Sequence, residues 1–102
     1  MDYSKDIALY TTNVNEKAVA TIVKYCGIAL RNKDSSLVST SDPAELGRVR
    51  EGFAFKKLGL TPEAADAGIK TVAAKMKADK TKSRVTFYYL LAEATNTMDK
   101  LA

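Results

Sequence analysis

The stretch Asp34–Leu60, DSSLVSTSDPAELGRVREGFAFKKLGL, contains in order a polar loop, a helix start, a helix body and a helix end. Asp42 precedes Pro43 and lies three residues before Glu45. An N-cap residue, a proline at the first helical position and a capping-box acid therefore coincide. We expect a helix to begin here and to end before Gly59, which can adopt the left-handed conformation that closes many helices.

The helix predicted over residues 43–58 has one apolar side and one charged side. Its apolar residues are Leu46, Val49, Phe53, Ala54 and Leu58, and the charged residues expected to face water are Glu45, Arg48, Glu51 and Lys56. This division is typical of a helix that covers a core. Glu45 and Arg48 have the spacing of a helical surface ion pair, as do Asp66 and Lys70 further along the chain.

Four other segments of the chain precede the last helix. Between Asn15 and Arg31, apolar residues recur every three or four positions, which predicts a helix with Asn15 as its N-cap. Thr61 and Pro62 repeat the cap-plus-proline start, so a second helix is expected there. Its apolar residues are Ala65, Ile69, Val72, Ala73 and Met76. Residues 1–14 are expected to hold a short or frayed helix, and residues 32–41 a loop pinned by Leu37 and Val38.

The last segment, which begins at Ser83, is apolar on nearly every side. Its sequence RVTFYYLL is rich in residues that strands prefer. However, AEA follows without a turn residue, and an ordered run of more than about a dozen residues favours a helix. A helix that is apolar all round is usually the buried centre of a bundle. We predict an all-α fold: a single compact domain over residues 1–102, with four to five helices packed around a buried C-terminal helix.

The composition fits one globular domain in a reducing compartment. The chain has 102 residues, of which 46% are hydrophobic and 27% charged. Cys26 is the single cysteine, so no disulfide can form within the chain. The longest strongly apolar run, Val85–Ala92, is far shorter than the roughly 20 residues of a membrane span. We therefore expect a cytoplasmic protein without a membrane segment.

Three motifs, SSLVSTSDPAEL, KKLGL and RVTFYYLL, occur in this order at characteristic spacings. Together they resemble a small bacterial family of uncharacterised helical proteins, the domain of unknown function numbered 2853. The resemblance covers roughly Asp34 to Leu91. The matching residues are Asp34, Ser35, Ser36, Val38, Ser39, Ser41, Asp42, Pro43, Glu45, Leu46, Phe53, residues 56–60, Arg84 and residues 87–91. The last residues, EATNTMDKLA, lack the glycine-containing, aromatic-ended tail associated with the family. The resemblance implies a helical fold and carries no activity or cofactor.

The sequence offers little for catalysis. Histidine is absent, which removes the commonest general base and the commonest metal ligand together. Cys26 shares an apolar stripe with Ile22 and Ala29, where a thiolate would be disfavoured, so we expect a buried structural cysteine. The serines of loop 35–41 lack the glycines of a phosphate-binding loop and are interpreted as turn and capping groups. We predict no enzymatic activity, no cofactor and no metal site.

A basic segment over residues 70–84 is the strongest candidate site. Against the single acid Asp79 it carries six cations, namely Lys70, Lys75, Lys77, Lys80, Lys82 and Arg84. Lys82 and Arg84 fall near the start of the last helix, where a cation opposes the helix dipole by about 0.3–1 kcal/mol and a bound anion would reverse that effect. The candidate contacts for a phosphate or a nucleic-acid backbone are Lys75, Lys77, Lys80, Lys82 and Arg84. The same charges also fit a solvated basic corner that only aids solubility.

Two functional hypotheses follow from these features. The first is a non-catalytic cytoplasmic interaction module with an unknown protein partner, because the chain combines clear structural punctuation with a lack of catalytic residues. The second is a phosphate or nucleic-acid backbone binder that uses the basic segment 70–84. Affinity that falls steeply with salt would distinguish the second hypothesis from the first.

Overall fold

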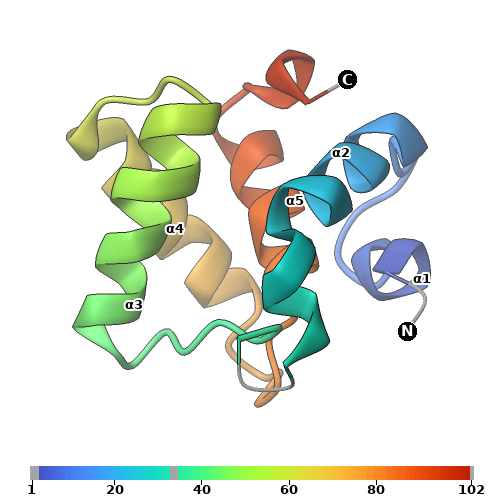
Figure 1. Cartoon of the computed structure of the whole chain (residues 1–102), viewed down its shortest axis with the longest axis horizontal. Helices are drawn as coiled ribbons and strands as arrows, with labels where there is room; N and C mark the ends of the chain where they lie inside the picture. Colours follow the sequence, from blue (N-terminus) through green and yellow to red (C-terminus); the bar gives the residue numbers. More distant parts are fainter. Residues whose placement is uncertain (1–2, 33–34, 102) are drawn as a thin grey trace.

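The C-terminal helix α5 (Arg84–Ala94) runs through the middle of the molecule (Figure 1). The computed structural model describes residues 3–32 and 35–101. The helices in contact with α5 are α1 (Tyr3–Ala8), α2 (Glu16–Cys26) and α4 (Pro62–Lys75). Every residue from Val85 to Ala92 is buried. Burial of apolar surface around this one helix therefore organises the domain, and the predicted all-α fold with a buried C-terminal helix is confirmed.

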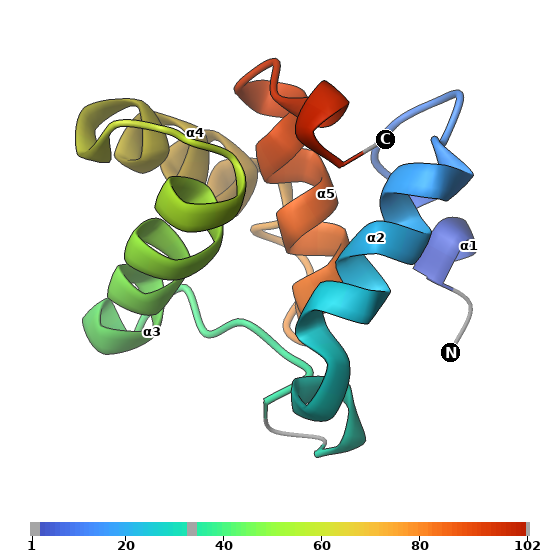
Figure 2. The ribbon, with the colours of Figure 1, turned by 45° about the horizontal axis from the view of Figure 1, so that its top comes forward.

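The helices form two groups on opposite sides of α5. Figure 2 shows α3 (Pro43–Arg48) and α4 on one side of α5, and α1 and α2 on the other. The predicted short N-terminal helix is α1, and its Ile7 side chain is buried. The domain predicted over 1–102 and the loop expected over 32–41 extend beyond the described residues at 1–2, 33–34 and 102. Asp34, the first residue of the diagnostic stretch, also lies outside them.

Side-chain N-caps start three of the helices where the sequence predicts them. The cap bonds run from the Ala18 N–H to Asn15 Oδ1 (3.1 Å), from the Ala44 N–H to Asp42 Oδ1 (3.0 Å) and from the Ala64 N–H to Thr61 Oγ1 (3.2 Å). Each cap satisfies a backbone donor that has no partner inside the helix. The capping box expected from Glu45 does not form, because the Asp42 N–H donates to the Ser39 carbonyl at 3.3 Å and the Glu45 carboxylate binds arginines instead.

The helix predicted over residues 43–58 changes its winding halfway. After α3 it continues as a π-helix, η2 (Val49–Lys57), in which hydrogen bonds reach back five residues. At its end the Leu58 N–H donates to the Phe53 carbonyl at 3.1 Å, and Gly59 has the expected left-handed φ of 71°. Most π-helices are single turns within α-helices, often at functional sites. In η2 the π-winding extends over nine residues.

The loop between α2 and α3 is tied to the start of α5. After Cys26 the chain tightens into a 3₁₀-helix, η1 (Gly27–Arg31), within the helix predicted over 15–31. Further on, the Val38 N–H donates to the Lys82 carbonyl and the Arg84 N–H to the Ser36 carbonyl, both at 2.8 Å. Val38 is buried, as the sequence predicts. These two backbone bonds join segments more than forty residues apart in the sequence.

A close approach at Gly68 brings α4 against the C-terminal half of α5. A Cβ atom at this position would lie 2.6 Å from Thr95 Cγ2 and 2.8 Å from Leu91 Cδ1. Only a residue without a side chain fits at such distances without a shift of its neighbours. After α5 a short 3₁₀-helix, η3 (Met98–Lys100), returns the chain so that Leu101 is buried.

Candidate functional sites

A groove of about 570 Å³ lies between η2 and α4 on the surface. Its lining residues are Arg50, Glu51, Phe55, Lys56, Pro62 and Asp66. The Phe55 side chain is 58% exposed although phenylalanine usually lies in the core. Its neighbours Phe53 and Ala54 are buried, so η2 directs two successive residues inward and turns the following aromatic ring outward. The sequence analysis did not single out this groove.

An ion pair fixes the two walls of the groove relative to each other. Arg50 Nη1 of η2 lies 3.1 Å from Asp66 Oδ1 of α4, and Arg50 Nη2 lies 3.9 Å from Glu51 Oε1. Asp66 therefore pairs across helices with Arg50, and the expected pair with Lys70 on the same helix is wrong. The reason is that η2 packs alongside α4, which places Arg50 within reach of Asp66.

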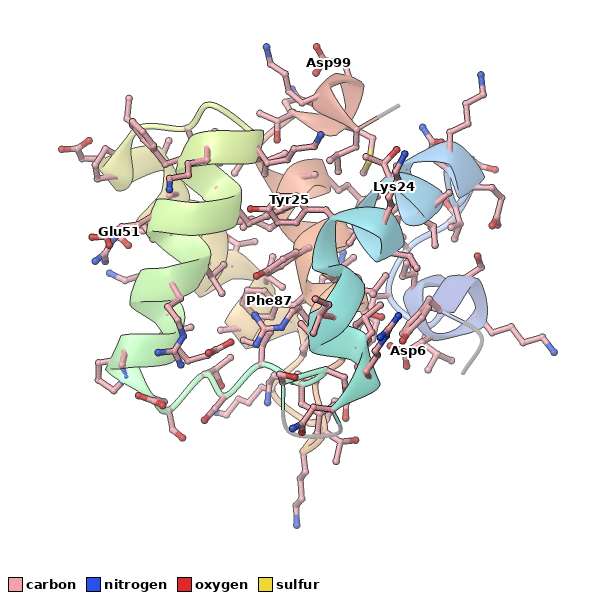
Figure 3. The ribbon with its side chains drawn as sticks, in the orientation of Figure 1. Asp6, Lys24, Tyr25, Glu51, Phe87 and Asp99 are labelled. Carbon is pink, nitrogen blue, oxygen red and sulfur yellow. The ribbon has the colours of Figure 1, made fainter. Side chains whose placement is uncertain are left out.

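The groove is electrically neutral in a basic protein. Two cations, Arg50 and Lys56, face two anions, Glu51 and Asp66, whereas the whole chain has a formal net charge of +4. The Glu51 side chain is 80% exposed, and Figure 3 shows it at the outer edge of the molecule, directed away from α5. This neutral surface lacks the excess positive charge of an anion site, and its exposed Phe55 ring belongs to a residue type that is enriched at protein–protein contacts.

The lysines of the basic segment are spread over different environments. Lys75 Nζ lies 3.8 Å from Glu93 Oε1 of α5, and Lys82 Nζ donates to the Asp79 carbonyl at 2.7 Å. Lys77 and Lys80 are exposed in the connection between α4 and α5, and within the described residues neither has an ion-pair partner. The structure thus leaves two of the five candidate contacts as open cations on the surface.

Arg84 points into the protein, which corrects the expectation that it offers a free cation at the start of α5. Its side chain is 11% exposed. Its donors bind the Ser35 carbonyl (2.6 Å), the Leu37 carbonyl (3.2 Å), the Tyr88 hydroxyl (3.0 Å) and the Glu45 carboxylate. Burial lowers the pKa of Arg84, but the contacts with Tyr88 and Glu45 outweigh it and raise that pKa above its ordinary value. The guanidinium is therefore a structural clamp that joins α5, α3 and the preceding loop.

Glu45 is the buried partner of this clamp, so the expectation that it faces water is wrong. Its side chain is 9% exposed and also accepts from Arg48 Nη2 at 2.7 Å, which confirms the expected pair with Arg48. A buried carboxylate needs a cation and hydrogen bonds to offset its lost hydration, and Arg84 supplies both. No local pattern could reveal this pair, because the two residues lie 39 positions apart.

The amino end of α5 is also enclosed. The N-cap residue Ser83 is buried, and its hydroxyl has no hydrogen-bond partner among the described residues. The Thr86 hydroxyl in the first turn donates to the carboxylate of Asp6 from α1. A carboxylate at this end of a helix is favoured by the dipole, so the protein itself supplies the negative charge that the sequence analysis assigned to a bound anion.

The aromatic residues of α5 serve the core, as the sequence predicts. Phe87, Tyr88 and Tyr89 are all buried, and Figure 3 shows Phe87 in the interior. The Tyr88 ring stacks on Phe53 with centroids 4.0 Å apart. The Tyr25 ring of α2 also lies close to Phe53, with the ring centroids 5.5 Å apart. These rings pack against one another and are not arranged to stack on bases.

Cys26 lies beside this cluster as a buried thiol. Burial raises its pKa from 9.0 to about 11, although the charge of Arg84 acts in the opposite direction. The thiol is therefore protonated at neutral pH, as expected of a structural cysteine. Within the described residues, no three or more metal-ligating side chains come together. None of the helices in that part of the chain combines the length and apolar character that a bilayer crossing requires.

These features define an all-α, single-domain protein built around a buried central helix. The chain matches the family described as Protein of unknown function (DUF2853) over residues 2–99, and it belongs to this family. The match confirms the resemblance seen in the sequence and extends it beyond Asp34–Leu91 to nearly the whole chain. Among curated proteins, none matches the chain.

Proposed function

We propose that this protein is a non-catalytic cytoplasmic interaction module that binds another protein through the groove between η2 and α4. The observation that carries the proposal is the exposed Phe55 ring at a 570 Å³ groove. The volume lies within the roughly 300–1,000 Å³ of pockets that hold a compact organic group. Burial of this exposed aromatic ring in an interface with a partner would stabilise the complex relative to the free protein.

Two contacts also join the parts of the chain that form the groove. The Arg50–Asp66 ion pair connects its two walls, and the Leu60 N–H bond to the Ala54 carbonyl (2.9 Å) closes the end of η2. A preformed surface loses little conformational entropy on binding. The π-winding supports the proposal as well, because such departures from α-geometry occur frequently at functional sites.

Affinity capture tests this proposal. The tagged protein is incubated with lysate of the cells that produce it, alongside the variants Phe55→Ala and Ile28→Ala. Ile28 is 81% exposed on η1, away from the groove, so its variant removes a comparable apolar side chain as a matched control. We expect the same protein to be recovered in stoichiometric amounts by wild type and by Ile28→Ala, and to be lost with Phe55→Ala. Equal capture by all three proteins would refute the role of the groove.

The alternative function, binding of a nucleic-acid backbone, is supported by the exposed Lys77 and Lys80. Arg84 and the amino end of α5 are engaged inside the protein, so this alternative has fewer contacts than the sequence indicates. The same capture, run at low salt with and without nuclease, tests it with Lys77→Gln/Lys80→Gln. Nuclease-sensitive recovery that this variant loses would favour the alternative, because contacts to phosphates are electrostatic and salt-dependent.

A further inference from the structure

We infer that the partner seated on the groove is a second copy of this chain, so that the protein forms a two-fold symmetric dimer through η2 and α4. This inference rests on the proposed function, since it uses the same groove. The distribution of charge on the groove and on the rest of the molecule favours a second copy as the partner.

The groove carries charges of both signs. A two-fold contact brings the same patch of both copies together, so a patch fits itself only if it holds both signs in comparable number. The groove fulfils this condition, because Arg50 and Lys56 supply two positive charges and Glu51 and Asp66 supply two negative charges. In a two-fold arrangement, the Lys56 of one copy can face the Glu51 of the other. Both of these side chains are exposed, and Lys56 has no ion-pair partner within the described residues.

The chain as a whole is basic, in contrast to the neutral groove. Two copies that each carry a net charge of +4 repel each other least when they meet at a neutral region. The groove is such a region, whereas the connection with Lys77 and Lys80 is not. An acidic partner would instead be drawn to the lysines outside the groove. The neutral groove therefore suits a copy of this basic chain better than it suits an acidic protein.

The groove also has two apolar lining residues. Phe55 and Pro62 lie at the same groove, one on each wall. When two copies meet about a two-fold axis, the Phe55 ring of each can cover the groove of the other and lie against its Pro62. Aromatic anchors at the centre with charged pairs at the rim are the usual anatomy of a specific interface.

Charge swapping tests the inference with the full chain. Glu51→Lys makes the groove positive and Lys56→Glu makes it negative, so each variant should repel its own copies. Mixed together, the two variants should recover a one-to-one dimer. The matched controls are Asp99→Lys and Lys24→Glu, which change the net charge equally at exposed positions on η3 and α2 (Figure 3).

Sedimentation equilibrium from micromolar to millimolar concentration provides the measurement. We expect wild type and both control variants to show a concentration-dependent rise toward the mass of two chains. Each groove variant, and Phe55→Ala, should weaken the dimer by about tenfold or more.

Three results would overturn the inference: a wild-type chain that stays monomeric, a dimer that the groove variants leave intact, or groove variants that do not recombine on mixing. The Phe55-dependent capture described above separates this failure from that of the proposed function. If the chain is monomeric and Phe55-dependent capture of another protein persists, only the identification of the partner as a second copy is wrong. If that capture is absent as well, the interaction module is also refuted. Circular dichroism of each variant verifies that the helices are retained.

Discussion

Replacement of Arg84 by Met is expected to lower the free energy of unfolding by about 3 kcal/mol. The Arg84–Glu45 pair is nearly excluded from water, with side chains 11% and 9% exposed. Removal of one partner of a buried ion pair typically costs about 3–5 kcal/mol, because the other charge remains buried. Glu45 keeps its ion pair with Arg48 at 2.7 Å, which still compensates part of the carboxylate charge, so the lower end of this range applies. This loss is a large fraction of the free energy of unfolding of a typical domain, which is roughly 5–15 kcal/mol.

Urea unfolding followed by far-UV circular dichroism measures this loss, with Glu45→Gln and the double variant completing a double-mutant cycle. The double variant should be less destabilised than the sum of the single variants, since removal of both charges relieves the unpaired carboxylate. Lys80→Met serves as the control at an exposed lysine and should stay within about 0.5 kcal/mol of wild type. A change of less than about 1 kcal/mol for Arg84→Met, or strict additivity in the cycle, would refute the clamp.

Two further predictions concern packing and pH. Gly68→Ala should destabilise the protein by about 1–2 kcal/mol in thermal unfolding, because the new Cβ would collide with Leu91 and Thr95, whereas Gly52→Ala meets no atom within 4 Å and should be neutral or stabilising. Equal effects of the two variants would contradict the close approach of α4 and α5. Burial raises the pKa of Cys26 from 9.0 to about 11, so the unfolded chain loses this proton first and stability should fall as pH rises from 9 to 11. Cys26→Ala should flatten this fall in urea titrations, and an unchanged slope would contradict the buried thiol.

The local elements of the fold could be predicted from the sequence because their signals lie within a few residues. The caps at Asn15, Asp42 and Thr61 and the left-handed Gly59 are found where they were expected. The burial of α5 also follows from its composition alone, since a segment that is apolar all round can only be stable inside. Each of these features depends on the chemistry of one short segment.

The candidate sites could be predicted only in part. The charge count singled out the lysines around residues 70–84, but charge counts contain no information about which cations are engaged. Arg84 was expected to be a free cation near the start of the last helix and Glu45 a water-facing residue of an amphipathic helix, and the structure pairs them in the interior. The apolar pattern left Phe55 off the buried side, and the structure exposes its ring, but the pattern could not show that α4 lies beside it and completes a groove.

The sequence by itself determined where three of the helices begin, where the helix before Gly59 ends, which helix is central and that the chain has no histidine for catalysis. Tertiary structure alone decided the Arg84 clamp, the Asp6 carboxylate at the start of α5, and the groove between η2 and α4. The physical reason is the range of the interactions. Caps, turns and apolar periodicity act between near neighbours, whereas these three features contain contacts between residues 16 to 80 positions apart, and only the packing of the helices brings them together.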